Sequence, residues 1–111
     1  MLVHKDCVVD INYGKLSVRQ LTPRTVADIN RLLPRGSTPL TIVSLRRILE
    51  SGTSLFVALD DKTIVGVVVM SRALTLLTQE YKIHEALVND LYAGHMVKSK
   101  LLNMAADAQS R

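Results

Sequence analysis

The sequence is poor in the residues that mark several protein classes. Its 111 residues include one cysteine (Cys7), no tryptophan and only 4 % aromatic residues. A single cysteine excludes a disulfide framework and fits a reducing compartment, so we expect a cytoplasmic protein. Few aromatic side chains are available to stack on nucleic-acid bases. The longest apolar run, 64–70, is much shorter than the roughly 20 residues of a membrane span, so we expect no transmembrane helix.

Apolar residues are plentiful and the charge is uneven. Hydrophobic residues make up 48 % of the chain and charged residues 22 %, which predicts one folded domain with its own core. The net charge is +4, and the segment 21–52 contains five arginines against Asp28 and Glu50. This segment is either a solvated helical face or a surface for an acidic partner or phosphates.

The spacing of apolar residues predicts the element order β-β-α-α-β-β-β-α. The predicted strands cover 8–11, 16–21, 54–59, 63–71 and 81–89. The predicted helices cover about 22–33, 41–52 and 97–108. Thr22 is placed to cap the first helix, the second begins at about Thr41 and ends at Gly52, and Asn12-Tyr13-Gly14 is typical of a turn. The order favours an α+β fold, with helices packed on a sheet rich in antiparallel pairs.

The stretch 88–102 is the most informative part of the chain for function. It is predicted to run from a strand through a short glycine-containing turn into the last helix. A helix N-terminus presents backbone N–H groups and a partial positive charge, which together suit a phosphate or pyrophosphate. By contrast, His4 and Cys7 have no second ligand pair, so the sequence predicts no metal site.

Residues 16–105 resemble the N-terminal part of the GCN5-related N-acetyltransferase (GNAT) family. The resemblance lies in the opening phrase 19–29, in the hairpin 56–68 with Gly66, and in the strand-to-helix spacing of 88–102. The family's turn reads Arg/Gln-x-x-Gly-x-Gly/Ala, and its backbone amides hold the pyrophosphate of acetyl-CoA. The resemblance therefore implies a GNAT-like sheet and an acetyl-CoA site at this turn.

The resemblance places the cofactor on the end of the last strand and on the turn. The cofactor-binding residues that it implies are Leu87, Val88, Asn89, Ala93, Gly94, His95, Met96, Val97 and Lys98. The backbone of the first three is expected to polarise the acetyl carbonyl where the strand bulges. The signature positions fall on Ala93, Met96 and Lys98, which all differ from the pattern, whereas the intervening Gly94 is present. The Met96 side chain is expected to obstruct the phosphate, and Lys98 is either a phosphate ligand or solvated.

Glu85 is the candidate general base, because some relatives place one on this strand; it is otherwise an exposed carboxylate. The implied function is acetyl-CoA-dependent transfer to an amine acceptor. Two alternatives stay open. A catalytically inactive GNAT-like binding or assembly module is favoured by the altered signature. A small basic nucleic-acid-binding protein fits the net charge, although no recognised nucleic-acid motif supports it.

The family normally continues beyond the helix 97–108. We therefore expect one domain over 1–111, with 1–14 as an N-terminal extension and 15–111 as the N-terminal part of the fold, lacking the C-terminal half. The last strand then has an open edge, and the apolar stripe of the last helix is partly uncovered. This predicts a homodimer or a protein partner that covers the edge of the sheet.

Overall fold

The computed structural model describes residues 10–74 and 79–109. Most of the strand predicted at 8–11 lies outside the described residues. In chain order, the elements are β1 (Ile11–Lys15), η2 (Val18–Gln20), α1 (Pro23–Leu32), α2 (Ile42–Glu50), β2 (Thr53–Asp60), β3 (Thr63–Leu74), β4 (Gln79–Val88), η3 (Asp90–His95) and α3 (Val97–Gln109). Within the described residues, no helix has the length and apolar character that crossing a membrane requires.

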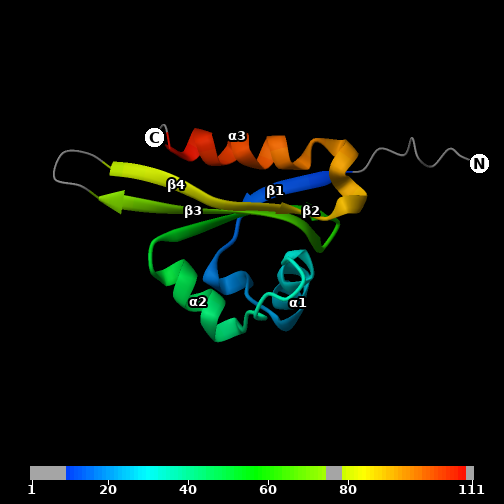
Figure 1. Cartoon of the computed structure of the whole chain (residues 1–111), viewed down its shortest axis with the longest axis horizontal. Coiled ribbons are helices and arrows are strands. Elements are labelled where there is room, and N and C mark those ends of the chain that lie inside the picture. Colours follow the sequence, from blue (N-terminus) through cyan, green and yellow to red (C-terminus); the bar gives the residue numbers. More distant parts are fainter. Residues whose placement is uncertain (1–9, 75–78, 110–111) are drawn as a thin grey trace, which may run out of the picture.

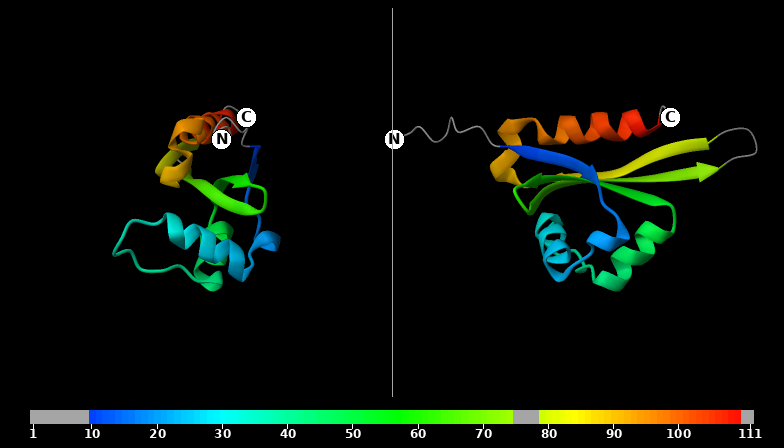
Figure 2. Two further views of the ribbon diagram at one scale, coloured as in Figure 1. Left: turned by 90° about the vertical axis from the view of Figure 1, so that its right-hand side faces the viewer. Right: turned by 180° about the vertical axis from the view of Figure 1, so that it is seen from behind.

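The four strands form one antiparallel sheet in the order β1-β2-β3-β4. Helices α1 and α2 cover one face of the sheet, and α3 covers the other (Figures 1 and 2). The expected α+β architecture is therefore confirmed. In the described part of the chain, β4 pairs only with β3, so its other edge is open.

Alternation along the strands divides the core between the two faces. The buried residues on the side of α1 and α2 are Leu16, Val26, Ile29, Leu45, Leu55, Val57, Ile64 and Val67. Those on the side of α3 are Phe56, Ala58, Val65, Val68, Met70, Val97, Leu101 and Ala105. The central strands β2 and β3 contribute to both clusters, which is why their sequences are apolar at successive positions.

Local capping chemistry fixes the starts of the first two helices, and the cap at Thr22 was predicted. The Thr22 hydroxyl accepts a hydrogen bond from the Thr25 amide at 3.2 Å. The Thr41 hydroxyl accepts one from the Ser44 amide at 3.1 Å. Each bond satisfies one of the N–H groups that a helix start leaves unpaired. Gly52, just past the end of α2, has φ of 95°, which only glycine adopts readily.

Two predictions near the N-terminus were wrong. Positions 12–14 lie inside β1, where Gly14 is opposite Val57, because pairing with β2 overrides their turn propensity. The strand predicted at 16–21 is replaced by the short helix η2. There the Gln20 side chain accepts a hydrogen bond from the Ser17 amide at 2.8 Å, a local bond that competes with strand pairing.

Helix α3 packs closely on the sheet at its buried positions. Val97, Leu101 and Ala105 are at most 1 % exposed, whereas Met104 and Ala108 of the same stripe are half-buried, in agreement with the expectation of a partly uncovered stripe. Gly66 on β3 explains the close approach. A methyl group on its Cα would lie 3.0 Å from side-chain atoms of both Val97 and Leu101. The glycine of the hairpin therefore lets the start of α3 sit directly on the sheet.

Candidate functional site

The turn between β4 and α3 is anchored at its first residue. The Asn89 amide donates to the Val65 carbonyl oxygen at 2.9 Å, which extends the pairing of β4 with β3 by one residue. The Asn89 side chain accepts a hydrogen bond from the Leu91 amide at 2.9 Å and so caps η3. The turn therefore leaves the sheet from a fixed point and in a fixed direction.

A second anchor joins the turn to the end of β2. The Tyr92 hydroxyl donates to the Asp60 carboxylate. This hydrogen bond, helped by partial burial and by the negative charge of Asp60, raises the pKa of the Tyr92 phenol above its usual value. The sequence does not reveal this contact, because 32 positions separate the two residues.

The N-terminus of α3 begins with an unusual backbone conformation. Met96 has φ of 57° and ψ of 27°, the left-handed region that glycine adopts more readily. Its carbonyl oxygen accepts from the Lys100 amide at 3.0 Å, the first bond of the helix. The amides of Val97, Lys98 and Ser99 precede this bond, so their N–H groups have no partner within the helix. They give the turn a partial positive charge.

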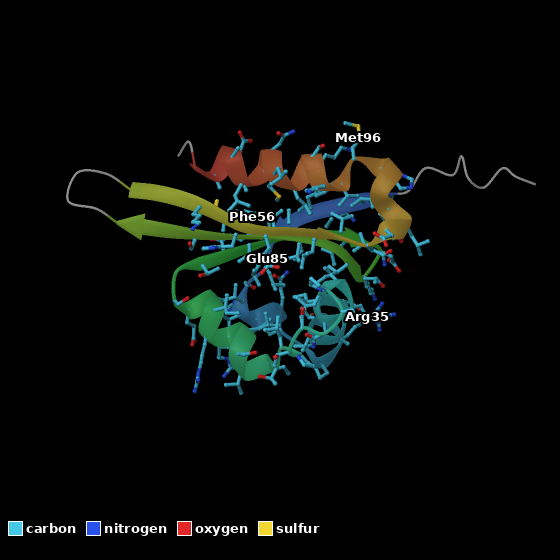
Figure 3. All side chains as sticks on the ribbon, in the orientation of Figure 1. Arg35, Phe56, Glu85 and Met96 are labelled. Atoms are coloured by element: carbon cyan, nitrogen blue, oxygen red, sulfur yellow. The ribbon has the colours of Figure 1, made fainter. Side chains whose placement is uncertain are left out.

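The space around the turn is open to a ligand. A methyl group on Gly94 would meet no atom within 4 Å. The Met96 side chain is 64 % exposed and projects away from the sheet at the start of α3 (Figure 3). It therefore does not fill the turn. His95 and Lys98 are exposed as well, whereas the side chain of Val97 is buried between α3 and the sheet. Ala93 lies within the short helix η3.

The alternation of backbone groups along β4 distinguishes the three strand residues that were expected to contact the acetyl group. The Asn89 amide points toward β3, where it bonds to Val65. Because amide directions alternate along a strand, the Leu87 amide also points toward β3, and the Val88 amide points to the open edge. The bulge of β4 lies at His84. Val69 pairs with Glu85 and Met70 pairs with Ile83, so His84 has no partner residue on β3. Only Val88 among the three thus presents an N–H group outward.

An apolar hollow of about 370 Å³ lies between the sheet and the connection from α1 to α2. We call it the apolar hollow; its lining residues are Ile29, Leu33, Pro34, Ser37, Thr38, Leu40, Leu45, Ile48, Leu55, Val67, Val69, Glu85 and Leu87. Glu85 points into the α1/α2 side of the sheet, opposite Phe56 on the α3 side (Figure 3). The candidate base therefore lies at the wall of a cavity and is itself exposed to solvent.

Hydrogen bonds fix the connection that forms the outer wall of the apolar hollow. The Asn30 side chain donates to the Leu40 carbonyl oxygen at 3.0 Å and accepts from the Leu40 amide at 2.8 Å. The Ser37 amide donates to the Pro34 carbonyl oxygen at 3.1 Å, and Gly36 between them has φ of 91°. These features form a type II turn inside a closed loop. The hollow is consequently part of the folded structure.

A second, more polar hollow of about 290 Å³ lies beside the first. We call it the polar hollow; it is lined by Arg31, Leu32, Leu33, Val88, Asn89 and Asp90. Leu33 belongs to both linings. The two hollows therefore follow β4 from Glu85 to the start of the turn. Within 10–74 and 79–109, no three His, Cys, Asp or Glu side chains gather as metal ligands, and His4 and Cys7 lie outside these ranges.

Solved structures share the fold of this chain, although no protein-family model and no curated protein matches the sequence. A chain of the NatC complex bound to Gag peptide and CoA superposes with a TM-score of 0.70 at 25 % identity. The match covers 92 % of this chain and 68 % of that chain. The chain has the GNAT fold. The resemblance inferred from the hairpin and from the strand-to-helix spacing is thereby confirmed.

Two further GNAT structures show the same fold at lower identity. An aminoglycoside acetyltransferase from an uncultured soil metagenomic sample, in complex with sisomicin, has a TM-score of 0.78 at 16 % identity. It is matched over 90 % of this chain and 70 % of its own. An acetyltransferase from Trypanosoma brucei has a TM-score of 0.74 at 17 % identity, over 91 % and 75 % of the two chains. The GNAT fold is common to these matches, while the bound molecules differ, with Gag peptide and CoA in the NatC complex and sisomicin in the aminoglycoside acetyltransferase.

Proposed function

We propose that the protein binds acetyl-CoA along β4 and transfers the acetyl group to an amine. The observation that carries this proposal is the anchored turn, which combines an open Gly94 with the unpaired amides at the start of α3. These groups fit a pyrophosphate, because the amides donate hydrogen bonds and the absence of a side chain on Gly94 allows close approach. The solved NatC structure contains CoA, which supports the same assignment.

Four of the candidate residues then have a defined part in binding. The amides of Val97 and Lys98 hold the pyrophosphate, and the ammonium group of Lys98 adds a positive charge near the phosphates. The polar hollow beside Val88 and Asn89 receives the chain that leads from the pyrophosphate to the thioester. Acetyl-CoA supplies an activated acetyl group. The outward N–H of Val88 donates to the acetyl carbonyl oxygen as negative charge develops there.

Glu85 accepts the proton from the attacking amine. The amine approaches from the apolar hollow, whose wall carries the Glu85 carboxylate. Removal of the proton leaves the nitrogen lone pair free to attack the acetyl carbonyl carbon. The carbon–sulfur bond then breaks, and the leaving thiolate takes the second proton from the nitrogen, so that the products are the amide and the CoA thiol. Glu85 and Val88 lie on the same strand, so their relative placement is fixed by β4.

Release of the CoA thiol tests this function. Protein at a fixed concentration is incubated with acetyl-CoA and candidate amines, and the new thiol is measured against a blank for the protein's own cysteine. Glu85→Gln should lower kcat by about 100-fold or more, the usual contribution of a general base. Glu50→Gln, on the exposed end of α2, is the matched control and should keep full activity. Unchanged turnover in Glu85→Gln would refute the assigned base.

The altered turn supports one alternative, a GNAT-fold module that binds CoA without catalysis. Met96 holds a strained backbone at the position where the family has a glycine, which is the specific observation in its favour. Acetyl-CoA binding without thiol release for any amine would select this alternative. If the protein neither bound acetyl-CoA nor released its thiol, both the acetyltransferase function and the non-catalytic alternative would be rejected.

We also propose that a second copy of the chain covers the open edge of β4 over 79–84, which leaves the N–H of Val88 free for the acetyl group. In the described residues, β4 has a partner strand on one side only, so a row of backbone N–H and C=O groups faces outward. Such an edge pairs readily with another strand. Light scattering on the purified protein at micromolar concentration should give the mass of a dimer. A monomer at that concentration would contradict this proposal.

A further inference from the structure

The apolar hollow has a distinctive chemical character. Among the side chains that the structure describes, Glu85 is the only ionisable one in its lining, and Ser37 and Thr38 are the only others that are polar. All the remaining lining residues are leucine, isoleucine, valine or proline. A cavity of this kind favours a ligand that combines an apolar body with a single positive charge.

We propose that the acceptor is a monoamine, a primary amine carried on an apolar body of one or two side-chain-sized groups. The term acceptor rests on the proposed function, whereas binding of the amine is a property of the hollow alone. The volume of about 370 Å³ is near the lower end for ligand cavities, which limits the body to this size. The ammonium group lies at the Glu85 carboxylate, and the body lies against the apolar wall formed by Val67 and Leu87.

The same lining disfavours ligands with several charges or many hydroxyl groups. A second ammonium group would find no carboxylate in the hollow, and an unpaired buried charge is costly. Arg31 lines the neighbouring polar hollow, and Arg35 lies on the connection beyond α1 (Figure 3). A polycation would thus meet like charges nearby. A sugar would find only the hydroxyl groups of Ser37 and Thr38 for its own hydroxyls.

Binding without acetyl-CoA tests the proposal separately from catalysis. A series of straight-chain amines from butylamine to octylamine is titrated into the full chain, with the matching alcohols as neutral controls. Affinity should rise about two- to fourfold for each added methylene until the hollow is full. In NMR spectra, the methyl groups of Ile29, Leu45 and Val67 should shift.

The charge of Glu85 is tested by two variants. Glu85→Gln should weaken amine binding about three- to fivefold, the value of a solvent-exposed ion pair, and leave alcohol binding unchanged. Glu50→Gln should change neither. Equal loss of amine and alcohol binding in Glu85→Gln, or no loss of either, would overturn the proposal. Circular dichroism establishes that each variant is folded.

Further titrations identify the source of the amine. One ligand is a short peptide with a free α-amine on an apolar first residue, compared with the same peptide N-acetylated. If the free peptide binds more tightly than octylamine, the amine is a peptide N-terminus. If octylamine binds more tightly, the amine is a small molecule. Tighter binding of sisomicin, a polycation, than of either would overturn the proposal. Amine binding without any acetyl-CoA binding would remove the proposed function and keep the amine site.

Discussion

Replacing Met96 with glycine should stabilise the protein. Met96 holds φ of 57° and ψ of 27°, a region that costs a residue with a Cβ about 1–2 kcal/mol. Its side chain is 64 % exposed, so little apolar burial is lost on removal. Glycine loses about 0.5–1 kcal/mol more backbone entropy on folding. The difference predicts a gain of about 0.5–1 kcal/mol, or roughly 2–5 °C in Tm.

Urea denaturation followed by circular dichroism measures this gain against two controls. Met96→Ala removes the same exposed side chain and keeps the Cβ, so it should give no gain. Asp61→Gly acts at the other described non-glycine residue with positive φ, at 59°, and should give a smaller gain, because aspartate tolerates this conformation better than methionine. If Met96→Ala stabilised the protein as much as Met96→Gly, the reasoning from backbone strain would be refuted.

Three further substitutions test the elements that position the site. Gly66→Ala should destabilise the protein by about 1–3 kcal/mol in urea, because the added methyl group overpacks the contact with α3; unchanged stability would contradict this. Asn30→Ala should cost about 1–3 kcal/mol through the two lost bonds to Leu40 and should weaken amine binding in the apolar hollow; wild-type values for both would count against it. The raised pKa of Tyr92 favours its neutral form in the folded state, so its contribution to stability should be complete below about pH 10 and lost at higher pH. Tyr92→Phe, which removes the bond to Asp60, should accordingly lose less stability than the wild type between pH 9 and about 11; identical pH profiles would disprove this account.

Signals that act over a few residues were sufficient to predict most of the fold. Thr22 caps the first helix as its sequence context indicated, the second helix begins after Thr41 as expected, and the β-branched run after Lys62 is a strand buried on both faces. The prediction failed near Gly14, where a typical turn sequence is held in a strand by pairing with β2. Local propensity is weak compared with such a tertiary contact.

The sequence predicted the parts of the candidate site that are close together in the chain, but not the contacts between distant segments. The turn around Gly94 and the carboxylate of Glu85 follow from spacing and resemblance, because both lie on consecutive elements. The bond from Tyr92 to Asp60 joins distant segments and has no sequence signature. The apolar hollow likewise exists only once α1, α2 and the sheet come together. Sequence spacing also gave no means of knowing that Val88 alone directs its amide to the open edge.

The proposed function depends above all on binding of the acetyl-CoA pyrophosphate by the turn between β4 and α3. Its most direct test is a titration of acetyl-CoA followed through the backbone amides of 88–98 by NMR. Gly94→Ala places a methyl group in the open space at the turn, and Gly14→Ala makes the same change in β1, where it also meets no atom. We expect amide shifts in the wild type and in Gly14→Ala. In Gly94→Ala, we expect affinity about tenfold lower or worse, a loss of ~1.4 kcal/mol. Absence of shifts in the wild type at millimolar acetyl-CoA, or equal affinity in all three proteins, would contradict binding at this turn.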